Sequence, residues 1–330
     1  LNAYLGGQAS GSAAVNLLTG KANPSGKLAE TYPLALSDTP CFRRFPGSTR
    51  SVEYRESVYV GYRYYDTFGK DVLFPFGFGL SYTKFEYSGL RLSRKSIKDT
   101  DTLKVTFKVK NVGGVAGAEI AQVYVSDVES TVFRPEKELK GFKKVFLEPG
   151  EEKTVTVSLD RRAFAYFNTE AEAWHVESGE FTVKVGASSR DIRLSSSVNV
   201  ASTDENITAS DYRETAPVYY TGDPANVPDG DFAALLGKDI PYLNERAGSE
   251  ITINSALEDA DGTAAGHVVN NLLKKLFKAI SGGNPAQERM MMSMALQIPI
   301  RCFISMSMGV FTPEMADGLC LILNGRGTLK

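Results

Sequence analysis

The sequence predicts a mixed fold class, with a two-sheet β-sandwich in the middle of the chain and a small, mainly helical module at its end. Apolar and polar residues alternate over 103–110, and turn residues such as Pro149 and Gly150 separate further short apolar runs; both patterns are typical of a sandwich. Apolar residues at helical spacing over 264–280 predict the helical module. With 330 residues, the chain can form two or three domains, each with its own core.

The first 84 residues contain a helix, turns and short extended runs. Residues 10–18 offer an apolar face, and Gly20 is a typical helix stop, so we expect a helix there. Residues 27–33 are expected to be extended. Residues 58–65 alternate with a period of two, which predicts a strand or a pleated loop. These pieces read as the last segment of a domain rather than a whole domain.

Residues 85–201 are expected to form the sandwich, because short strands and turns follow one another at the spacing of immunoglobulin-like folds. In such a sandwich, the apolar face of each sheet packs against the other sheet. Predicted strands cover 103–110, 120–126, 140–147, 153–159, 179–187 and 192–200.

The rest of the chain is predicted to be an irregular connection followed by helices. Residues 202–250 are rich in Asp, Pro, Gly, Thr and Tyr and are interpreted as a long connection. Residues 251–330 form the helical module, in which 264–280 is an amphipathic helix with lysines largely on its polar face. Pro285 opens a second helix that runs to about residue 297, and Thr312 caps a last one.

Composition excludes several classes of function. The net charge is −2 with both signs interspersed, so no long-range field favours nucleic acid or an anionic membrane as a partner. Cys41, Cys302 and Cys320 are widely spaced, which predicts neither a disulfide framework nor a zinc site. The few cysteines favour a reducing compartment, and we expect the cytoplasm. The first residues do not resemble a signal peptide and say nothing about the true N-terminus. No cofactor is expected.

The apolar run 290–311 raises the possibility of a membrane span. Gln297, Pro299 and Arg301 fall in its middle, and an arginine at the centre of a spanning helix costs about 2.5–3.5 kcal/mol. We therefore expect methionine-rich helices that pack against protein, with no membrane as a partner.

Two stretches of the first segment resemble the family 3 glycoside hydrolases. Residues 7–40 (GQASGSAAVNLLTGKANPSGKLAETYPLALSDTP) and 53–82 (EYRESVYVGYRYYDTFGKDVLFPFGFGLSY) are similar to the end of the family's α/β sandwich domain. GAEIAQVYVSD, ELKGFKKVFLEPGE and WHVESGEFTVKVGASSRDI resemble the fibronectin type III-like domain that follows it. MMMSMALQIPIRCFISMS and TPEMADGLCLILNG resemble the C-terminal extension of some long bacterial members. Ala9 departs from the family, in which many members carry Glu, so the subfamily is left open.

The resemblance implies the C-terminal part of a retaining exo-β-glycosidase of β-glucosidase type. In that family, the aspartate nucleophile lies on a preceding (β/α)8 barrel, and the glutamate acid/base lies before the Gly7-Gln8 turn. Both would lie upstream of Leu1. The implied partners are therefore the missing barrel and a β-linked oligosaccharide or glycoside substrate, and the chain alone is expected to be inactive. The alternative is a non-catalytic module for carbohydrate or protein binding, or for scaffolding.

No residue of the chain is assigned a catalytic, cofactor-binding or metal-binding role. Retaining glycosidases use two carboxyl groups about 5–5.5 Å apart. Glu53 and Glu56 are the best local candidates, but they do not match the family's acid/base motif, and we expect them to pair with nearby arginines. His175 and His267 lie far apart, with no nucleophile motif beside either, so neither a triad nor a metal centre is predicted.

Aromatic residues and glycines in the first segment have a functional and a structural interpretation. The rings could stack on sugars, but clustered rings more often pack in a core, and core packing is expected. Gly77 and Gly79 could suggest a phosphate loop, but the third glycine and the lysine are missing, so tight turns are expected. The rings concerned are Tyr59, Tyr62, Tyr64, Tyr65, Phe68, Phe74, Phe76, Phe78 and Tyr82.

Overall fold

The structure is a computed structural model that describes residues 1–45, 52–204, 206–240 and 250–326. The chain divides into two compact units, which are described separately. The first holds Leu1–Arg43 and Tyr54–Lys238, and the second holds Arg44–Glu53 and Asp239–Lys330. The predicted mixed fold class, with a β-sandwich and a helical module, is confirmed.

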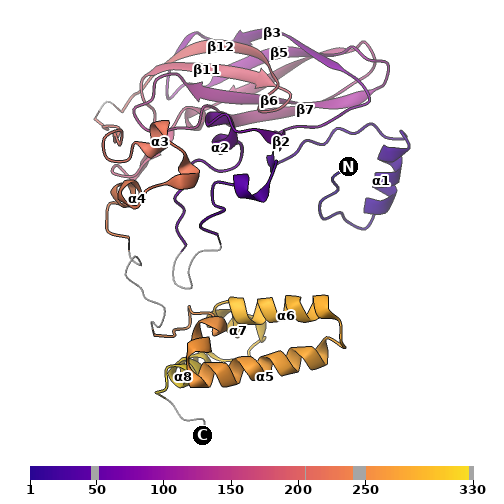
Figure 1. The fold of residues 1–330 in the computed structure, drawn as a ribbon. Coiled ribbons are helices and arrows are strands. Elements are labelled where there is room, and N and C mark those ends of the chain that lie inside the picture. Colours follow the sequence, from indigo (N-terminus) through magenta and orange to yellow (C-terminus); the bar gives the residue numbers. More distant parts are fainter. Residues whose placement is uncertain (46–51, 205, 241–249, 327–330) are drawn as a thin grey trace. The chain divides into compact units, whose positions relative to one another are not determined.

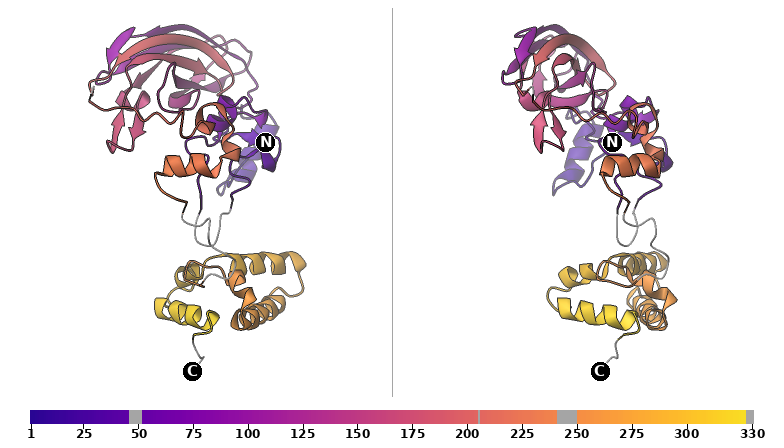
Figure 2. Two further views of the ribbon diagram at one scale, coloured as in Figure 1. Left: turned by 60° about the vertical axis from the view of Figure 1, so that its left-hand side comes forward. Right: turned by 90° about the vertical axis from the view of Figure 1, so that its left-hand side faces the viewer.

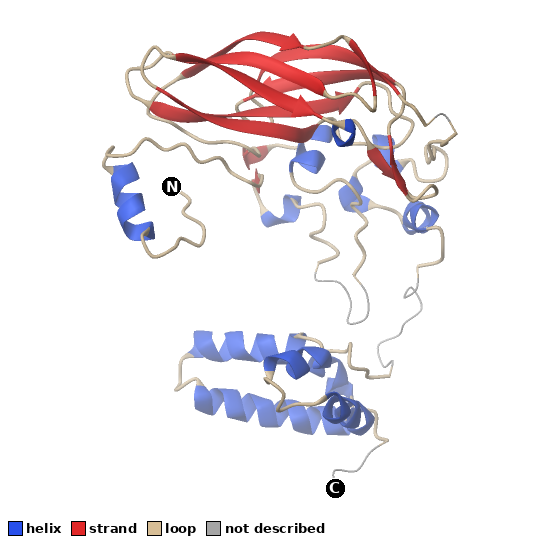
Figure 3. Ribbon diagram, turned by 180° about the vertical axis from the view of Figure 1, so that it is seen from behind, coloured by secondary structure: helices blue, strands red, loops and turns tan. Residues whose placement is uncertain are grey.

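A β-sandwich of two stacked sheets dominates the first unit (Figure 1). One sheet has the strand order β4-β12-β11-β6-β7 and the other the order β3-β5-β8. Strand β4 runs parallel to β12, and the other neighbours are antiparallel. Figure 3 shows the two layers of strands from the opposite side. The strands are β3 (Phe85–Leu92), β4 (Ser96–Lys98), β5 (Leu103–Asn111), β6 (Gly117–Asp127), β7 (Glu138–Leu147), β8 (Glu152–Leu159), β11 (Gly179–Gly186) and β12 (Ile192–Ala201).

The alternation that predicted β5 is confirmed. Leu103, Val105 and Phe107 are fully buried between the sheets, whereas Lys104 and Lys108 are exposed. Burying every second side chain removes apolar area from water on one face only, which is why this strand has a period of two. The rest of the core comes from the inner faces of both sheets, with members such as Val123, Leu147, Val155, Phe181 and Val198, and from Phe164 in the connection after β8.

From residue 85 onward, four strands escaped prediction because their signals are short or irregular. Strand β3 contains a register shift between Ser88 and Arg91, so its alternation breaks in the middle. Strand β4 is only three residues long. The hairpin of β9 (Tyr166–Asn168) and β10 (Ala173–His175) forms a separate two-stranded sheet. A window of three residues is too short for any period to be read from sequence.

The segment before the sandwich contains helix α1 (Ser10–Leu18), as predicted, and a small sheet of β1 (Tyr32–Pro33) and β2 (Val72–Phe74). The strand or pleated loop predicted over 58–65 is wrong for its second half, because Tyr62–Thr67 form helix α2. Gly61, with a φ of 55°, turns the chain into this helix. Aromatic rings occupy positions of both parities here, so the period of two carried no information about burial. The short helix η1 (Leu36–Asp38) also lies in this segment, and the short helix η2 (Arg161–Ala163) follows β8.

Residues 206–240, within the segment interpreted as a connection, contain short helices that pack against residues 55–65. They are α3 (Val218–Thr221), η3 (Pro224–Asn226) and α4 (Asp229–Leu236). The Tyr219 hydroxyl donates to the Arg55 carbonyl at 2.8 Å, and the Tyr59 hydroxyl donates to the Tyr219 carbonyl at 2.7 Å. The ring of Phe133, which precedes β7, stacks on Tyr219 with centroids 4.8 Å apart. These contacts tie the segment to the first unit.

The second unit is helical (Figure 2). Its elements are η4 (Leu257–Gly262), α5 (Ala264–Ile280), α6 (Pro285–Gln297), α7 (Ile300–Met306) and α8 (Pro313–Leu323). The predicted helices 264–280 and 285–297 are confirmed, and Thr312 caps α8 as predicted by accepting from the Met315 amide. Helix α7 was not predicted. The core includes Ile251, Leu257, Ala260, Ile300, Ala316, Cys320 and Leu323.

The apolar run 290–311 is divided between α6 and α7, with Ile298 and Pro299 between them. Ala295 and Ile300 are buried within the unit, which is the packing role expected for this run. No helix among the described residues is long and apolar enough to cross a membrane.

Gly77 and Gly79 sit where the loop after β2 approaches residues 26–28. The Gly77 amide donates to the Leu28 carbonyl and the Leu28 amide to the Phe78 carbonyl, both at 2.8 Å. Gly77 has a φ of 78°, which confirms the tight-turn interpretation for that residue. A β-carbon on Gly79 would instead collide with the carbonyl of Gly26, so close backbone approach explains the second glycine.

We expect Gly79→Ala to destabilise the first unit by about 1–3 kcal/mol, because two hydrogen-bonded backbones must move apart. The measurement is urea unfolding followed by the fluorescence of Trp174, the chain's single tryptophan. Gly114→Ala is the matched control, since its added β-carbon meets open space. Equal unfolding midpoints for the two variants would contradict the close-approach explanation.

Candidate functional site

Of the two acidic candidates from the sequence, Glu53 pairs with an arginine, and the pairing of the Glu56 side chain stays a prediction. Glu53 forms an ion pair with Arg44 at 3.5 Å, which confirms the pairing with a nearby arginine for this residue. Glu56 is buried, and its backbone carbonyl accepts from the Tyr59 amide at 2.9 Å. Glu53 belongs to the second compact unit and Glu56 to the first.

Asp127 is a carboxyl group of the sandwich whose pKa is raised. Burial is the main cause, opposed by the attraction of the Arg134 guanidinium, which donates to Asp127 Oδ2 at 3.0 Å. A raised pKa in a carboxyl group is typical of a general acid. Asp127 is almost fully enclosed and paired, however, so a substrate cannot reach it in this arrangement.

The aromatic run of the first segment packs largely on itself. Tyr59, Tyr64 and Tyr65 are buried, and Tyr62 stacks on Phe76 with centroids 4.6 Å apart. Core packing is thereby confirmed for these rings, whereas it is wrong for Tyr82, which is 51% exposed. Burial raises the pKa of Tyr59 and Tyr64, so neither phenol ionises in the neutral range.

The histidines and cysteines remain apart. His175 is buried beside the ring of Tyr166, and His267 is exposed, with Nδ1 3.8 Å from Asp261. The two histidines belong to different compact units. Cys41, Cys302 and Cys320 are free thiols. Within the described residues, the side chains form no group of three or more metal-ligating residues.

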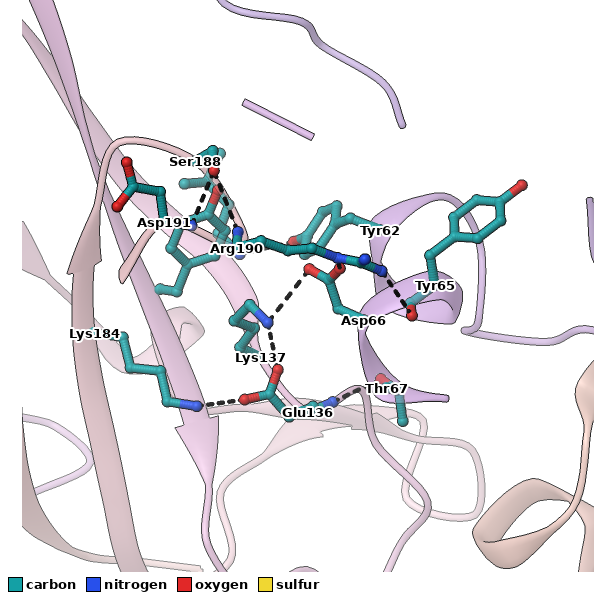
Figure 4. Close-up of polar contacts among 12 residues, drawn as sticks. Tyr62, Tyr65, Asp66, Thr67, Glu136, Lys137, Lys184, Ser188, Arg190 and Asp191 are labelled. Atoms are coloured by element: carbon teal, nitrogen blue, oxygen red, sulfur yellow. Dashed lines mark hydrogen bonds and ion pairs between the residues drawn. The ribbon is translucent and has the colours of Figure 1, made fainter. Parts of the chain in front are cut away.

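A polar cluster joins α2 to the sandwich (Figure 4). Arg190, in the turn between β11 and β12, donates through Nε to Asp66 at 2.7 Å and through Nη2 to the carbonyls of Tyr65 and Lys70 at 3.1 and 2.6 Å. Lys137, just before β7, lies 3.3 Å from the other oxygen of Asp66. We call these residues, with Glu136 and Lys184, the Asp66 cluster.

Charge alternates along the Asp66 cluster. Lys137 and Lys184 both donate to the Glu136 carboxylate. Burial alone would raise the pKa of Glu136, but the hydrogen bonds from the two lysines hold that pKa below its usual value. The Glu136 amide also donates to the Thr67 hydroxyl at 2.9 Å. The cluster therefore links the end of α2 to three separate parts of the sandwich.

A cavity of about 670 Å³ lies between the sandwich, the β9–β10 hairpin and residues 57–63, and we call it the Lys140 pocket. Glu138 is its central carboxylate, 3.0 Å from Lys140 and 3.2 Å from Arg63. The pKa of Lys140 is lowered by burial, and Glu138 does not fully offset this because Arg134 and Arg63 repel the ammonium group. The other lining side chains include Arg162, Phe133, Tyr166, Phe167, Trp174 and Tyr212.

A smaller cavity of about 330 Å³ lies beside η1 and is lined by Asp38, Tyr64, Lys70, Asp71 and Asp223 among others. Asp223 accepts from the Tyr64 hydroxyl at 3.0 Å and from Lys70 at 2.9 Å. Burial opposes these bonds, yet together with the Ala225 amide they hold the pKa of Asp223 below its usual value. These three polar side chains of the cavity wall are thus already hydrogen-bonded to one another.

Sequence reasoning missed the Asp66 cluster and the Lys140 pocket. Asp66 and Arg190 are 124 positions apart, so no local motif could reveal their contact. The sequence offered only an indirect indication of this contact. Asp66 stands among aromatic residues, and a carboxylate that is buried there needs a cation as its partner. The predicted sandwich did not specify which loop would deliver that cation.

Two family models match the chain. The glycosyl hydrolase family 3 C-terminal domain matches residues 1–82, and a fibronectin type III-like domain matches residues 119–189. Among curated relatives, thermostable β-glucosidase B of Acetivibrio thermocellus is 46% identical over 321 residues, which is 97% of this chain and 37% of the relative. An exo-α-(1→6)-L-arabinopyranosidase of Bifidobacterium breve is 49% identical over 192 residues, 58% of this chain and 25% of the relative.

Solved structures give the same picture. The β-glucosidase of Bifidobacterium adolescentis aligns with a TM-score of 0.59 at 41% identity, covering 71% of this chain and 33% of that one. β-Glucosidase 3B of Thermotoga neapolitana, in complex with α-D-glucose, aligns with a TM-score of 0.55 at 45% identity, covering 58% and 27%. The chain spans 37% or less of the length of these relatives.

Proposed function

Because this chain corresponds to the C-terminal domain of glycosyl hydrolase family 3 followed by a fibronectin type III-like domain, we propose that it serves as the C-terminal part of a β-glucosidase. The complete enzyme would be a retaining exo-β-glycosidase that removes terminal β-linked sugars. Its nucleophile and acid/base would lie in sequence that precedes Leu1. The observation that carries the proposal is the 46% identity with a β-glucosidase over nearly the whole chain.

The environments of three carboxyl groups support the proposal that this chain has a non-catalytic role in the enzyme. Glu53 and Asp66 are held by arginine or lysine, and Asp127 is enclosed behind Arg134. A retaining mechanism needs two carboxyl groups about 5–5.5 Å apart that both reach the sugar. Paired carboxylates of this kind fix structure, and we assign this chain no catalytic residue.

The first segment is suited to packing on further polypeptide. Helix α1 buries none of its residues, and Leu5, Leu18, Leu36 and Leu80 are largely exposed. Apolar side chains gathered on one segment are typical of an interface with another protein surface. We propose that the missing surface is the remainder of the α/β sandwich domain, with the barrel as its neighbour, and that the Asp66 cluster anchors this segment to the sandwich.

The boundaries proposed from the sequence are retained for this arrangement. They are 1–84 for the family 3 segment, 85–201 for the fibronectin type III-like sandwich, 202–250 for the connection and 251–330 for the helical module. The cytoplasm as location and the absence of nucleic-acid and membrane partners also stay predictions. The sugar is left open, since a β-glucosidase and an arabinopyranosidase have similar identity to the chain, 46% and 49%, over the residues that each of them matches.

We expect purified 1–330 to show no turnover of an aryl β-glucoside, because neither half of the carboxyl pair is available. The coding sequence upstream of the Leu1 codon should be read and expressed with it, and the longer product should hydrolyse the same substrate. Glu53→Gln and Glu56→Gln in 1–330 are the controls. Turnover by 1–330 that disappears in either variant would contradict the proposal.

A start codon close to Leu1, with no barrel encoded before it, would instead favour the alternative of a non-catalytic binding or scaffolding module. The Lys140 pocket is the observation that supports this alternative, because it is large enough for a small ligand.

A further inference from the structure

The Lys140 pocket carries more positive than negative charge. Arg63, Arg134, Lys140 and Arg162 all line it, whereas Glu138 is the carboxylate on its wall. Asp127, which does not line the pocket, forms an ion pair with Arg134 at 3.0 Å. Four cations thus meet two carboxylates within this group of side chains, and cations left in excess at a half-buried surface favour an anion.

Lys140 is a cation of the pocket that has little solvent exposure and shares its ion-pair partner. Its side chain is only 16% exposed, and its single ion-pair partner among the described residues is Glu138. Glu138 is shared with Arg63 at 3.2 Å and with Arg134 at 3.7 Å. A second anion beside Lys140 would relieve the repulsion among the three cations, which adds to burial in lowering the pKa of Lys140.

Several aromatic rings also line the pocket. Trp174 of the β9–β10 hairpin packs edge-on against Phe167 with centroids 5.5 Å apart, and the Arg162 guanidinium lies 3.4 Å from the centre of the Trp174 ring. Trp174, the chain's single tryptophan, is 39% exposed. Large rings half-exposed at a cavity provide flat apolar contact for a ligand ring.

We propose that the Lys140 pocket binds a saccharide that carries a carboxylate, with the carboxylate beside Lys140 and Arg63 and the sugar ring against the Trp174 hairpin. The choice of a saccharide over another cyclic carboxylate rests on the proposed function; the charge and the ring wall do not depend on it. A cavity of about 670 Å³ has room for one or two sugar rings by the usual size of ligand sites.

Trp174 makes the site directly observable. Excitation of the single tryptophan in the full chain should give a saturable fluorescence change on titration with glucuronate. Glucose has the same ring without the charge, and it should bind at least about tenfold more weakly than glucuronate. A factor of this size is typical of the loss of one hydrogen bond to a charged group. Acetate, which has the charge without the ring, should also bind at least about tenfold more weakly than glucuronate.

Lys140→Met should weaken glucuronate binding by about tenfold and leave the weak glucose response unchanged. Lys143→Met is the matched control, because Lys143 lies on the same strand but is exposed and does not line the pocket. Far-UV circular dichroism verifies that both variants fold. In the unsubstituted chain, glucuronate affinity should fall as the pH rises through the lowered pKa of Lys140 and as salt is added.

Equal responses to glucuronate and glucose would overturn the inference, as would equal losses in Lys140→Met and Lys143→Met. A response to acetate as strong as that to glucuronate would also overturn it, by showing a simple anion site. Should Lys140→Met fail to fold, the salt dependence decides: affinity for glucuronate that is insensitive to salt contradicts the proposal. None of these readouts uses hydrolysis, so an inactive longer enzyme would refute the proposed function while leaving this result intact.

Discussion

Replacing Asp66 by asparagine is expected to lower the free energy of unfolding of the first unit by about 3 kcal/mol. The Asp66 side chain is 4% exposed, and its carboxylate lies 2.7 Å from Arg190 and 3.3 Å from the buried Lys137. The amide of asparagine has the same shape, and its oxygen can still accept from Arg190. It cannot neutralise Lys137, so a buried ammonium loses half of its countercharge.

Urea unfolding followed by Trp174 fluorescence measures this effect, since Trp174 belongs to the same unit. Glu152→Gln is the matched control: Glu152 and Lys108 are also 2.7 Å apart, but both are solvent-exposed. Exposed pairs of this kind contribute less than about 1 kcal/mol. A loss for Asp66→Asn no greater than that for Glu152→Gln would mean that the Asp66 cluster does not anchor α2.

Removing the ring of Phe107 is expected to have an effect of similar or greater size. Phe107 is 0% exposed at the centre of β5, directly opposite Val155 of β8 and stacked near Tyr87 of β3. Phe107→Ala would leave a cavity between two sheets that cannot collapse without breaking their ladders. The expected loss is about 3–5 kcal/mol, and the same unfolding experiment measures it.

Phe146→Ala provides the comparison for Phe107, because Phe146 lies on β7 with its ring 54% exposed. Truncating an exposed side chain of a strand changes stability by about 0.5 kcal/mol. Losses of equal size in the two variants would contradict the placement of the core between the sheets. Helicity of the second unit, followed by circular dichroism, should be unaffected by either substitution, because that unit has its own core.

The elements that could be predicted are those with a long and regular period. Strand β5 extends over 9 residues and buries one face, so its sequence alternates with a period of two. Helix α5 extends over 17 residues with a regular helical period of apolar residues, of which Val269 and Leu273 pack against the core of the second unit while Val268 and Leu272 are exposed. The resemblance of residues 1–82 to family 3 was equally readable, because it depends on residue identity along the chain. Helix α2 was not predicted as a helix, since it has only six residues and its three tyrosines stand at positions of both parities, which gives no clear period.

The candidate site was beyond sequence reasoning for a different reason. The Asp66 cluster draws on α2, the approach to β7, strand β11 and the turn after it. Strand pairing decides which of these segments meet, and pairing is a property of the whole sandwich. The Lys140 pocket likewise combines β7, a hairpin and residues 57–63.

The sequence by itself determined the family resemblance, the sandwich, the helical module and the absence of the family's acid/base motif between Leu1 and Lys330, because each is written in contiguous residues. Only the tertiary structure decided that Asp66 meets Arg190 and Lys137, and that Lys140 shares Glu138 with two arginines in a pocket that Trp174 also lines. The physical reason is separation along the chain. Periodicity in neighbouring residues indicates which face of one element is buried. A buried charge is instead stabilised by groups that are distant in sequence and that the packing of the sheets brings within a few ångströms.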